Sequence, residues 1–210
     1  MASVKAPFRA ALLAAAAFAT LAGATRQQEA SNPADADSLA QKIENMRERY
    51  LRGDARAKDF RVSQQEVNAY LAHRLADQIP RGVKDLRVSF GPDLLNAGCL
   101  VDLAAMRDRL PDSSLALLFQ GQVPVELSAR VRAEGGLGKV DIQSCRLGGM
   151  EMPRAFLQQL LNMYAKSPSR PEGIRLEDSF ELPYGIRSAR LLAGEAVLRQ
   201  GPLEGQPGSR

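Results

Sequence analysis

The chain has 210 residues, a formal net charge of +4 and only 5% aromatic residues. Its Arg and Lys residues are spread along the chain beside Asp and Glu, whereas nucleic-acid binding needs cations gathered on one face with aromatics nearby. The composition therefore argues against a nucleic-acid partner. The single His and two cysteines cannot complete a zinc site at their spacing, and no motif predicts a cofactor.

Residues 1–24 have the pattern of an export signal. Lys5 and Arg9 precede the apolar run 10–21, and 22–24 form a small-x-small cleavage pattern. The run is shorter than the roughly 20 residues that cross a bilayer, although an uncleaved anchor remains the alternative. Cleavage would leave 186 residues with a net charge of +2, enough for one domain. We expect an exported protein of the periplasm or cell envelope.

Two helices are expected in the first part of the mature chain. Residues 25–37 are polar and predict a flexible spacer, after which Ser38 and Gln41 form a capping box that opens a helix over 38–51. That helix is mostly charged, so we place it on the surface. A second capping box, over 63–66, opens a helix whose apolar stripe contains Val67, Tyr70, Leu71 and Leu75.

From residue 83 onward the apolar residues recur with a period of two. This pattern predicts strands over 83–90, 95–103, 122–132 and 140–147, the last with a bulge near 143–144. A third helix, beginning at Pro153, carries Phe156, Leu157 and Leu160 on its apolar face. A strand over 174–182 and a hairpin over 186–199 follow, and the tail 201–210 is expected to be disordered. The order predicts one α+β domain over 38–200 with an antiparallel meander.

The two cysteines, Cys99 and Cys145, enter an oxidising compartment, where disulfides persist. In a simple meander they lie on the two strands that flank 122–132, about 9–10 Å apart. That separation exceeds the reach of a disulfide, about 7 Å between α-carbons. A strongly curled sheet or exchanged strands would allow the bridge, so a disulfide stays open as an alternative.

No catalytic constellation is recognisable. His73 aligns with the polar side of its helix and is expected to be solvated, and the chain has no nucleophile elbow, zinc-protease motif or phosphate-binding loop. Glu177, Asp178 and Glu181 are the acidic residues on which an unfamiliar hydrolase would depend. We therefore expect a protein that is not an enzyme.

The apolar faces of the helices and strands are the remaining candidate site. If the sheet and helices close incompletely, they leave an apolar slot in which each buried methylene contributes about 0.8 kcal/mol. An acyl chain would then be held by shape and area alone. The residues that we expect to line the slot are Val67, Tyr70, Leu71, Val123, Val125, Leu127, Phe156 and Leu160.

Three segments, in this order, resemble exported bacterial proteins of the YpmS-like and LmeA-like type. They are Val62–Leu71 (VSQQEVNAYL), Leu147–Pro153 (LGGMEMP) and Leu182–Arg187 (LPYGIR). The resemblance covers roughly residues 60 to 200, and the helix at 38–51 and the two cysteines have no counterpart in it. It implies similarity to tubular lipid-binding modules, in which a curled sheet wraps a long helix around an apolar cavity, and it carries over no catalytic residue.

Residues and resemblance together predict an α+β fold with a curved antiparallel sheet of about six to seven strands, wrapped around or against amphipathic helices. The expected function is to bind or shuttle a lipid or other apolar ligand in the envelope, with a membrane surface or an envelope protein as further partners. The alternative is a periplasmic scaffold or assembly partner with a solid core. The charged helix 38–51 would then be its docking surface.

Overall fold

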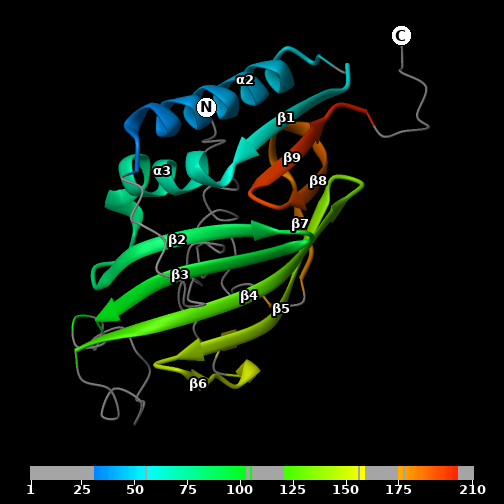
Figure 1. Cartoon of the computed structure of the whole chain (residues 1–210). Coiled ribbons are helices and arrows are strands. Elements are labelled where there is room, and N and C mark those ends of the chain that lie inside the picture. The colour runs from blue at the N-terminus through cyan, green and yellow to red at the C-terminus, as the bar shows by residue number, and fades with distance from the viewer. Residues whose placement is uncertain are drawn as a thin grey trace.

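The computed structural model describes residues 31–54, 56–102, 105, 121–155, 157–158, 175–176 and 178–202. Within these residues the fold is α+β, with two α-helices and one antiparallel sheet of nine strands (Figure 1). The predicted signal (1–24), most of the predicted spacer, Phe156, Leu160 and the tail from 203 lie outside the described residues. The α-helices are α2 (Pro33–Leu51) and α3 (Gln64–Arg74), and the short 3-10 helices are η1 (Ala76–Gln78) and η3 (Pro183–Gly185). The strands are β1 (Lys58–Ser63), β2 (Val83–Gly91), β3 (Leu94–Asp102), β4 (Gln122–Glu134), β5 (Leu137–Leu147), β6 (Met150–Glu151), β7 (Phe180–Glu181), β8 (Ile186–Leu192) and β9 (Glu195–Gln200).

The sheet branches at its longest strand, β4. The order is β1-β9-β8-β4-β3-β2, and β5 pairs with β4 along its other side. The pairing of β3 with β4 ends where Leu94 meets Arg130. The end of β4 beyond Arg130 is therefore free to pair with β8, through Ala133 and Ala189. Figure 1 shows the consequence: β2 to β5 run side by side, and the hairpin β8–β9 turns up from their far end toward α2.

One face of β2–β5 is apolar. On β3, Leu95, Ala97, Cys99 and Val101 are buried and share one parity, and each is in register with an apolar residue of β4. Partners in an antiparallel ladder point to the same side. We call this side, which also carries Val123, Val125, Leu127 and Ala129, the inner face, and the opposite side the outer face.

Local turn chemistry sets this register. β4 and β5 are joined by Gly135 and Gly136, whose φ angles of 63° and 84° are the left-handed values that a two-residue hairpin turn requires. The predicted bulge is confirmed, because Ser128 pairs with Ser144 while Ala129 pairs with Ile142, which leaves Gln143 as the extra residue. The bulge keeps apolar residues on the inner face before and after it.

Helix α3 closes one end of the inner face and covers the edge of β2. The predicted capping box is present: Glu66 N–H donates to Ser63 Oγ at 3.1 Å, and Ser63 N–H donates to the Glu66 carboxylate at 2.8 Å. The Asn68 side chain both donates to and accepts from the backbone of Val88, at 2.9 and 2.7 Å. Its amide thus satisfies backbone groups of β2 that no neighbouring strand pairs within the described chain.

Helix α2 begins earlier than expected. Its N-cap is Asn32, whose side chain accepts from Ala34 N–H, and Pro33 occupies the first helical turn. The predicted start at Ser38 and the predicted spacer over 33–37 are therefore wrong, because Ala36 and Leu39 bury an apolar stripe that begins within the polar segment. The predicted end near Gly53 is confirmed, since the helix ends at Leu51 and Gly53 has a φ of 65°.

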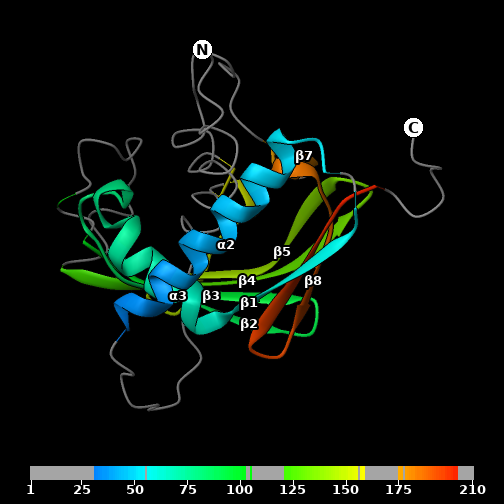
Figure 2. The ribbon, with the colours of Figure 1, turned by 90° about the horizontal axis from the view of Figure 1, so that it is seen from above.

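The α2 helix is also part of the core. Met46 has no exposed surface and packs with Phe60 and Ile186. Gln200, 2% exposed, donates through Nε2 to the Met46 and Tyr184 carbonyl oxygens, each at 2.7 Å. Figure 2 shows α2 crossing above α3 and the strands. Helix α2 therefore joins α3 to the β8–β9 hairpin.

Two strands were not predicted. β1 pairs antiparallel with β9, and β6 is a two-residue return from β5. Among the described residues of the predicted strand over 174–182, only the two residues of β7 are a strand. No helix in the described ranges is both long and apolar enough to cross a membrane.

Candidate functional site

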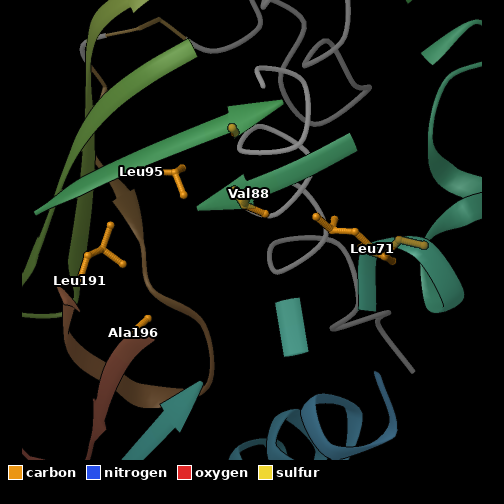
Figure 3. Close-up of a cluster of buried hydrophobic side chains, with 7 residues drawn as sticks. Leu71, Val88, Leu95, Leu191 and Ala196 are labelled. Carbon is orange, nitrogen blue, oxygen red and sulfur yellow. The ribbon is translucent and has the colours of Figure 1, made fainter. Parts of the chain in front are cut away.

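The predicted lining residues of α3 pack at one end of the inner face. Val67, Tyr70 and Leu71 belong to a cluster in which α3 packs against residues of the β2–β3 hairpin and of the β8–β9 hairpin. Figure 3 shows Leu71, Val88, Leu95, Leu191 and Ala196 drawn from α3, β2, β3, β8 and β9. The β2–β3 hairpin is far from the β8–β9 hairpin in sequence, so the cluster fixes how the β8–β9 hairpin sits against α3.

The predicted lining residues of β4 lie farther along the same face. Val123 and Val125 pack with Cys99, Val101 and Leu147, whereas Leu127 packs with Ala129, Cys145 and Leu157. Leu86 packs against the cluster at α3 and against the cluster of Val123. Met152 packs against the cluster of Val123 and against the cluster of Leu127. The six described lining residues are thus parts of one continuous apolar layer, spread along the inner face and not gathered at one spot. Phe156 and Leu160 lie outside the described residues.

The two cysteines face this layer from strands on either side of β4. Cys99 is in register with Val125 and Cys145 with Leu127, and both cysteines are buried. They form no disulfide. Burial, and then the nearby Cys99, raise the pKa of the Cys145 thiol to about 12, so this thiol stays protonated near neutral pH. The alternative of a bridge is not realised, because β4 lies between the two strands.

A hollow of about 260 Å³ lies beside β4 and β5. Its lining contains four cationic side chains, one carboxylate and two apolar side chains: Arg130, Arg132, Lys139, Arg154, Asp141, Val140 and Leu176. Arg130 is in register with Asp141, and Arg132 with Lys139. Arg154 lies 3.7 Å from the Asp141 carboxylate. We call this feature the basic hollow.

The apolar members of the basic hollow connect it with the interior. Val140 and Leu176 line the hollow and also pack against the cluster of Leu127, Cys145 and Leu157. The hollow therefore lies where the charged outer face meets the apolar layer.

The most deeply buried charge in the described chain joins elements of the fold. Glu66, 7% exposed, accepts hydrogen bonds from the Ser38 hydroxyl and from Lys42 Nζ at 2.6 and 2.7 Å. Lys42 also donates to the Arg61 carbonyl oxygen at 2.7 Å. Burial by itself would raise the pKa of Glu66, but the donors from Lys42, Ser38 and Ser63 outweigh it and hold the pKa below its usual range. This pattern is that of a structural ion pair linking α2, α3 and β1.

The two described acidic residues that were considered for hydrolysis, Asp178 and Glu181, lie exposed at the surface. Asp178 is exposed and accepts from Arg175 N–H at 3.0 Å, Glu181 is exposed on β7, and Glu177 lies outside the described residues. His73 is exposed, with its ring Nε2 3.0 Å from the Ser31 carbonyl oxygen. Among the residues with described positions, no cluster of His, Cys, Asp and Glu is suited to a metal ion.

Sequence reasoning did not identify the basic hollow. The alternation of the 122–132 strand puts Arg130 and Arg132 on the side opposite its apolar residues, but it does not show which residues lie beside them. The turn at Gly135–Gly136 contained the missing information, because a two-residue turn between Glu134 and Leu137 puts Arg132 opposite Lys139. Arg154 could not be placed in this way, since it follows a second turn and approaches β5 from outside the ladder.

Comparisons with family models, with curated proteins and with solved structures found no match to the chain. The resemblance to YpmS-like and LmeA-like proteins thus remains an expectation. The structure does give its first segment a physical basis: Ser63 and Glu66 form the capping box and Asn68 covers the β2 edge.

Proposed function

We propose that the protein is exported to the periplasm or cell envelope and holds a lipid or another apolar molecule against the inner face of its sheet. The compartment rests on the export pattern of residues 1–24. The ligand class rests on the absence of any recognisable catalytic motif together with the chemistry of the inner face.

The observation that carries the proposal is the continuity of the apolar layer across β2 to β5. Only one of the two described α-helices, α3, packs on this face, at the Leu95 and Ala97 end. Toward the Val123 end, the described side chains from outside β2–β5 that pack on the layer are Met152, Leu157 and Leu176. Among the described elements the layer extends beyond α3, and residues 154–155 and 157–158, which are helical, contribute Leu157 to it. Such a layer is a suitable wall for a long apolar ligand, which gains free energy from area and needs few polar contacts.

The ligand would lie between the inner face and the chain that packs on it. Val125 is half-buried at the middle of this face, and its neighbour Glu126 points to the outer face, where it approaches Arg146 at 3.8 Å. These two consecutive residues offer a matched pair of substitutions, one in the proposed site and one outside it.

Uptake of a fluorescent fatty acid tests the proposal. We expect saturable uptake by the wild-type protein, a loss of about tenfold in affinity for Val125→Gln because a polar amide replaces apolar lining, and no change for Glu126→Gln. Val125→Phe, which narrows the site while keeping it apolar, should weaken uptake of long chains without unfolding the protein. Absence of uptake by wild-type protein, or equal loss in the Glu126 control, would contradict the proposal.

A scaffold function is the second candidate, and one observation favours it. Tyr50 and Leu51, at the end of α2, are 54% and 60% exposed. The docking surface would then be this end of α2, not the length of the helix, because Met46 and Lys42 are tied into the fold. Deleting helix 38–51 would unfold the protein, so the double variant Tyr50→Ser/Leu51→Ser is the suitable test. It should abolish crosslinking to an envelope protein while leaving fatty-acid uptake and the thermal melt unchanged, and intact crosslinking would exclude this candidate.

A further inference from the structure

We propose that the basic hollow on β4 and β5 is a binding site for a phosphate-type oxyanion. This inference does not rest on the apolar ligand, because a soluble phosphate compound suffices to test it. The group bound could be a free phosphate compound or the head group of a lipid, which share the same chemistry.

The first argument is an imbalance of charge. Within the described chain, the side chains of Arg130, Arg132 and Lys139 form no salt bridge or hydrogen bond, and Asp141 is the one carboxylate in the lining. Asp141 is already engaged, since it accepts from Gln143 Nε2 at 2.9 Å and lies 3.7 Å from Arg154. The hollow therefore concentrates positive charge that a dianion would neutralise.

Two arginines elsewhere on the sheet are complemented by a carboxylate on the neighbouring strand. On β5, Arg146 lies 3.8 Å from Glu126 of β4, and on β1, Arg61 lies 2.6 Å from Glu195 of β9. Outside the hollow, β4 and β5 place an acid across from a base at Glu126 and Arg146, whereas within it Arg132 lies across from Lys139. The hollow differs in gathering three cations without a described ionic partner on two neighbouring strands.

The second argument is the register of the hairpin. Arg132 lies directly opposite Lys139 on β4 and β5, and like charges in direct opposition destabilise a ladder. A bound anion between the two side chains would convert this repulsion into attraction on both sides. Local violations of the rules of stability are expected at functional sites.

The third argument is the fit of shape and chemistry. The hollow, of about 260 Å³, has room for a phosphate group. Arginine guanidinium groups donate in a planar fork that matches phosphate oxygens, and the ion pair with Asp141 holds Arg154 at the rim. The described lining has no aromatic side chain on which a base could stack, whereas Val140 and Leu176 offer an apolar wall beside the cations. An anionic group with a small or apolar substituent fits better than a nucleotide.

Calorimetric titration with inorganic pyrophosphate at low ionic strength tests the site in solution. We expect binding by the wild-type protein that weakens as salt is raised, and a loss of about tenfold or more in Arg132→Gln/Lys139→Gln, because charge-assisted hydrogen bonds are removed. The matched control is Arg87→Gln, an exposed arginine on β2 that is not part of the hollow. Thermal melts should show that both variants remain folded.

Vesicle sedimentation identifies the source of the anion. The protein is compared on phosphatidylglycerol–phosphatidylcholine vesicles and on pure phosphatidylcholine vesicles. Pyrophosphate binding without vesicle binding assigns the hollow to a soluble phosphate compound. Binding to the anionic vesicles that the double variant loses assigns it to a lipid head group. No binding in either experiment, or equal loss in the Arg87 control, overturns the inference. Fatty-acid uptake that persists in the double variant would leave the apolar site standing by itself.

Discussion

Replacing Glu66 with Gln removes the charge at the junction of α2, α3 and β1 while leaving the shape of the side chain nearly unchanged. The carboxylate accepts from the Ser38 hydroxyl, from Lys42 and from Ser63 N–H. A hydrogen bond to a charged group contributes roughly 1.5–3 kcal/mol, and solvent screens the pair in part because the Lys42 side chain is 32% exposed. We therefore expect Glu66→Gln to lower the free energy of unfolding by about 2 kcal/mol near neutral pH.

The pH dependence of this loss separates charge from packing. The pKa of Glu66 in the folded protein lies below its usual range, so its stabilising effect is fully present above the unfolded pKa of about 4.3 and is lost as the pH falls through the folded value. Urea unfolding at neutral pH and at about pH 3 should show the gap between wild type and variant closing on acidification. Glu48→Gln is the control, since that side chain is 49% exposed and should change stability by less than about 0.5 kcal/mol. A gap of the same size at both pH values would refute the reasoning.

Three further substitutions or treatments follow from the fold. Cys145, whose pKa is raised to about 12 by burial, should resist iodoacetamide in the folded protein and react in urea, so rapid labelling of native protein would contradict its placement. Asn68→Ala leaves backbone groups of Val88 unpaired, and it should cost about 1–3 kcal/mol in urea unfolding and speed hydrogen exchange of the Val88 amide. An unchanged exchange rate would show that the β2 edge is covered by other means. Gly138→Val places a Cβ 2.5 Å from the Phe180 ring, so it should displace β7 and cost about 1–3 kcal/mol, and an unaltered thermal melt would count against this packing.

Alternation and turn chemistry predicted the meander well, because the inner face buries every second residue and only one register does so. Leu95, Ala97, Cys99 and Val101 are all buried, as their shared parity required. The hairpins at Gly135–Gly136 and Gly194 connect neighbouring strands, so local sequence determines them.

The missed elements depend on partners distant in sequence. β1 has only Phe60 and Val62 as apolar residues, among charged neighbours, and it becomes a strand by pairing with β9. The start of α2 was misplaced because the polar residues 25–37 predicted a spacer and Ser38 and Gln41 have the spacing of a capping box, whereas the helix begins after Asn32. In the structure, Ser38 donates to Glu66 in another helix, a contact that no local pattern contains.

The apolar face was predicted in composition but not in arrangement. Alternation correctly placed Val123, Val125 and Leu127 on one face, yet it could not show that Val67, Tyr70 and Leu71 pack at the far end of that face. Their position is set by α3 docking on Leu95 and Ala97 together with the β8–β9 hairpin. Such three-way packing arises only from the assembled sheet.

Native mass spectrometry of the protein purified from a bacterial host, followed by organic extraction, tests the central claim most directly. The account predicts a bound species whose mass identifies a lipid or similar apolar molecule and which is lost in Val125→Gln but retained in Glu126→Gln. A single peak at the mass of the unliganded chain, with nothing apolar in the extract, would contradict the claim.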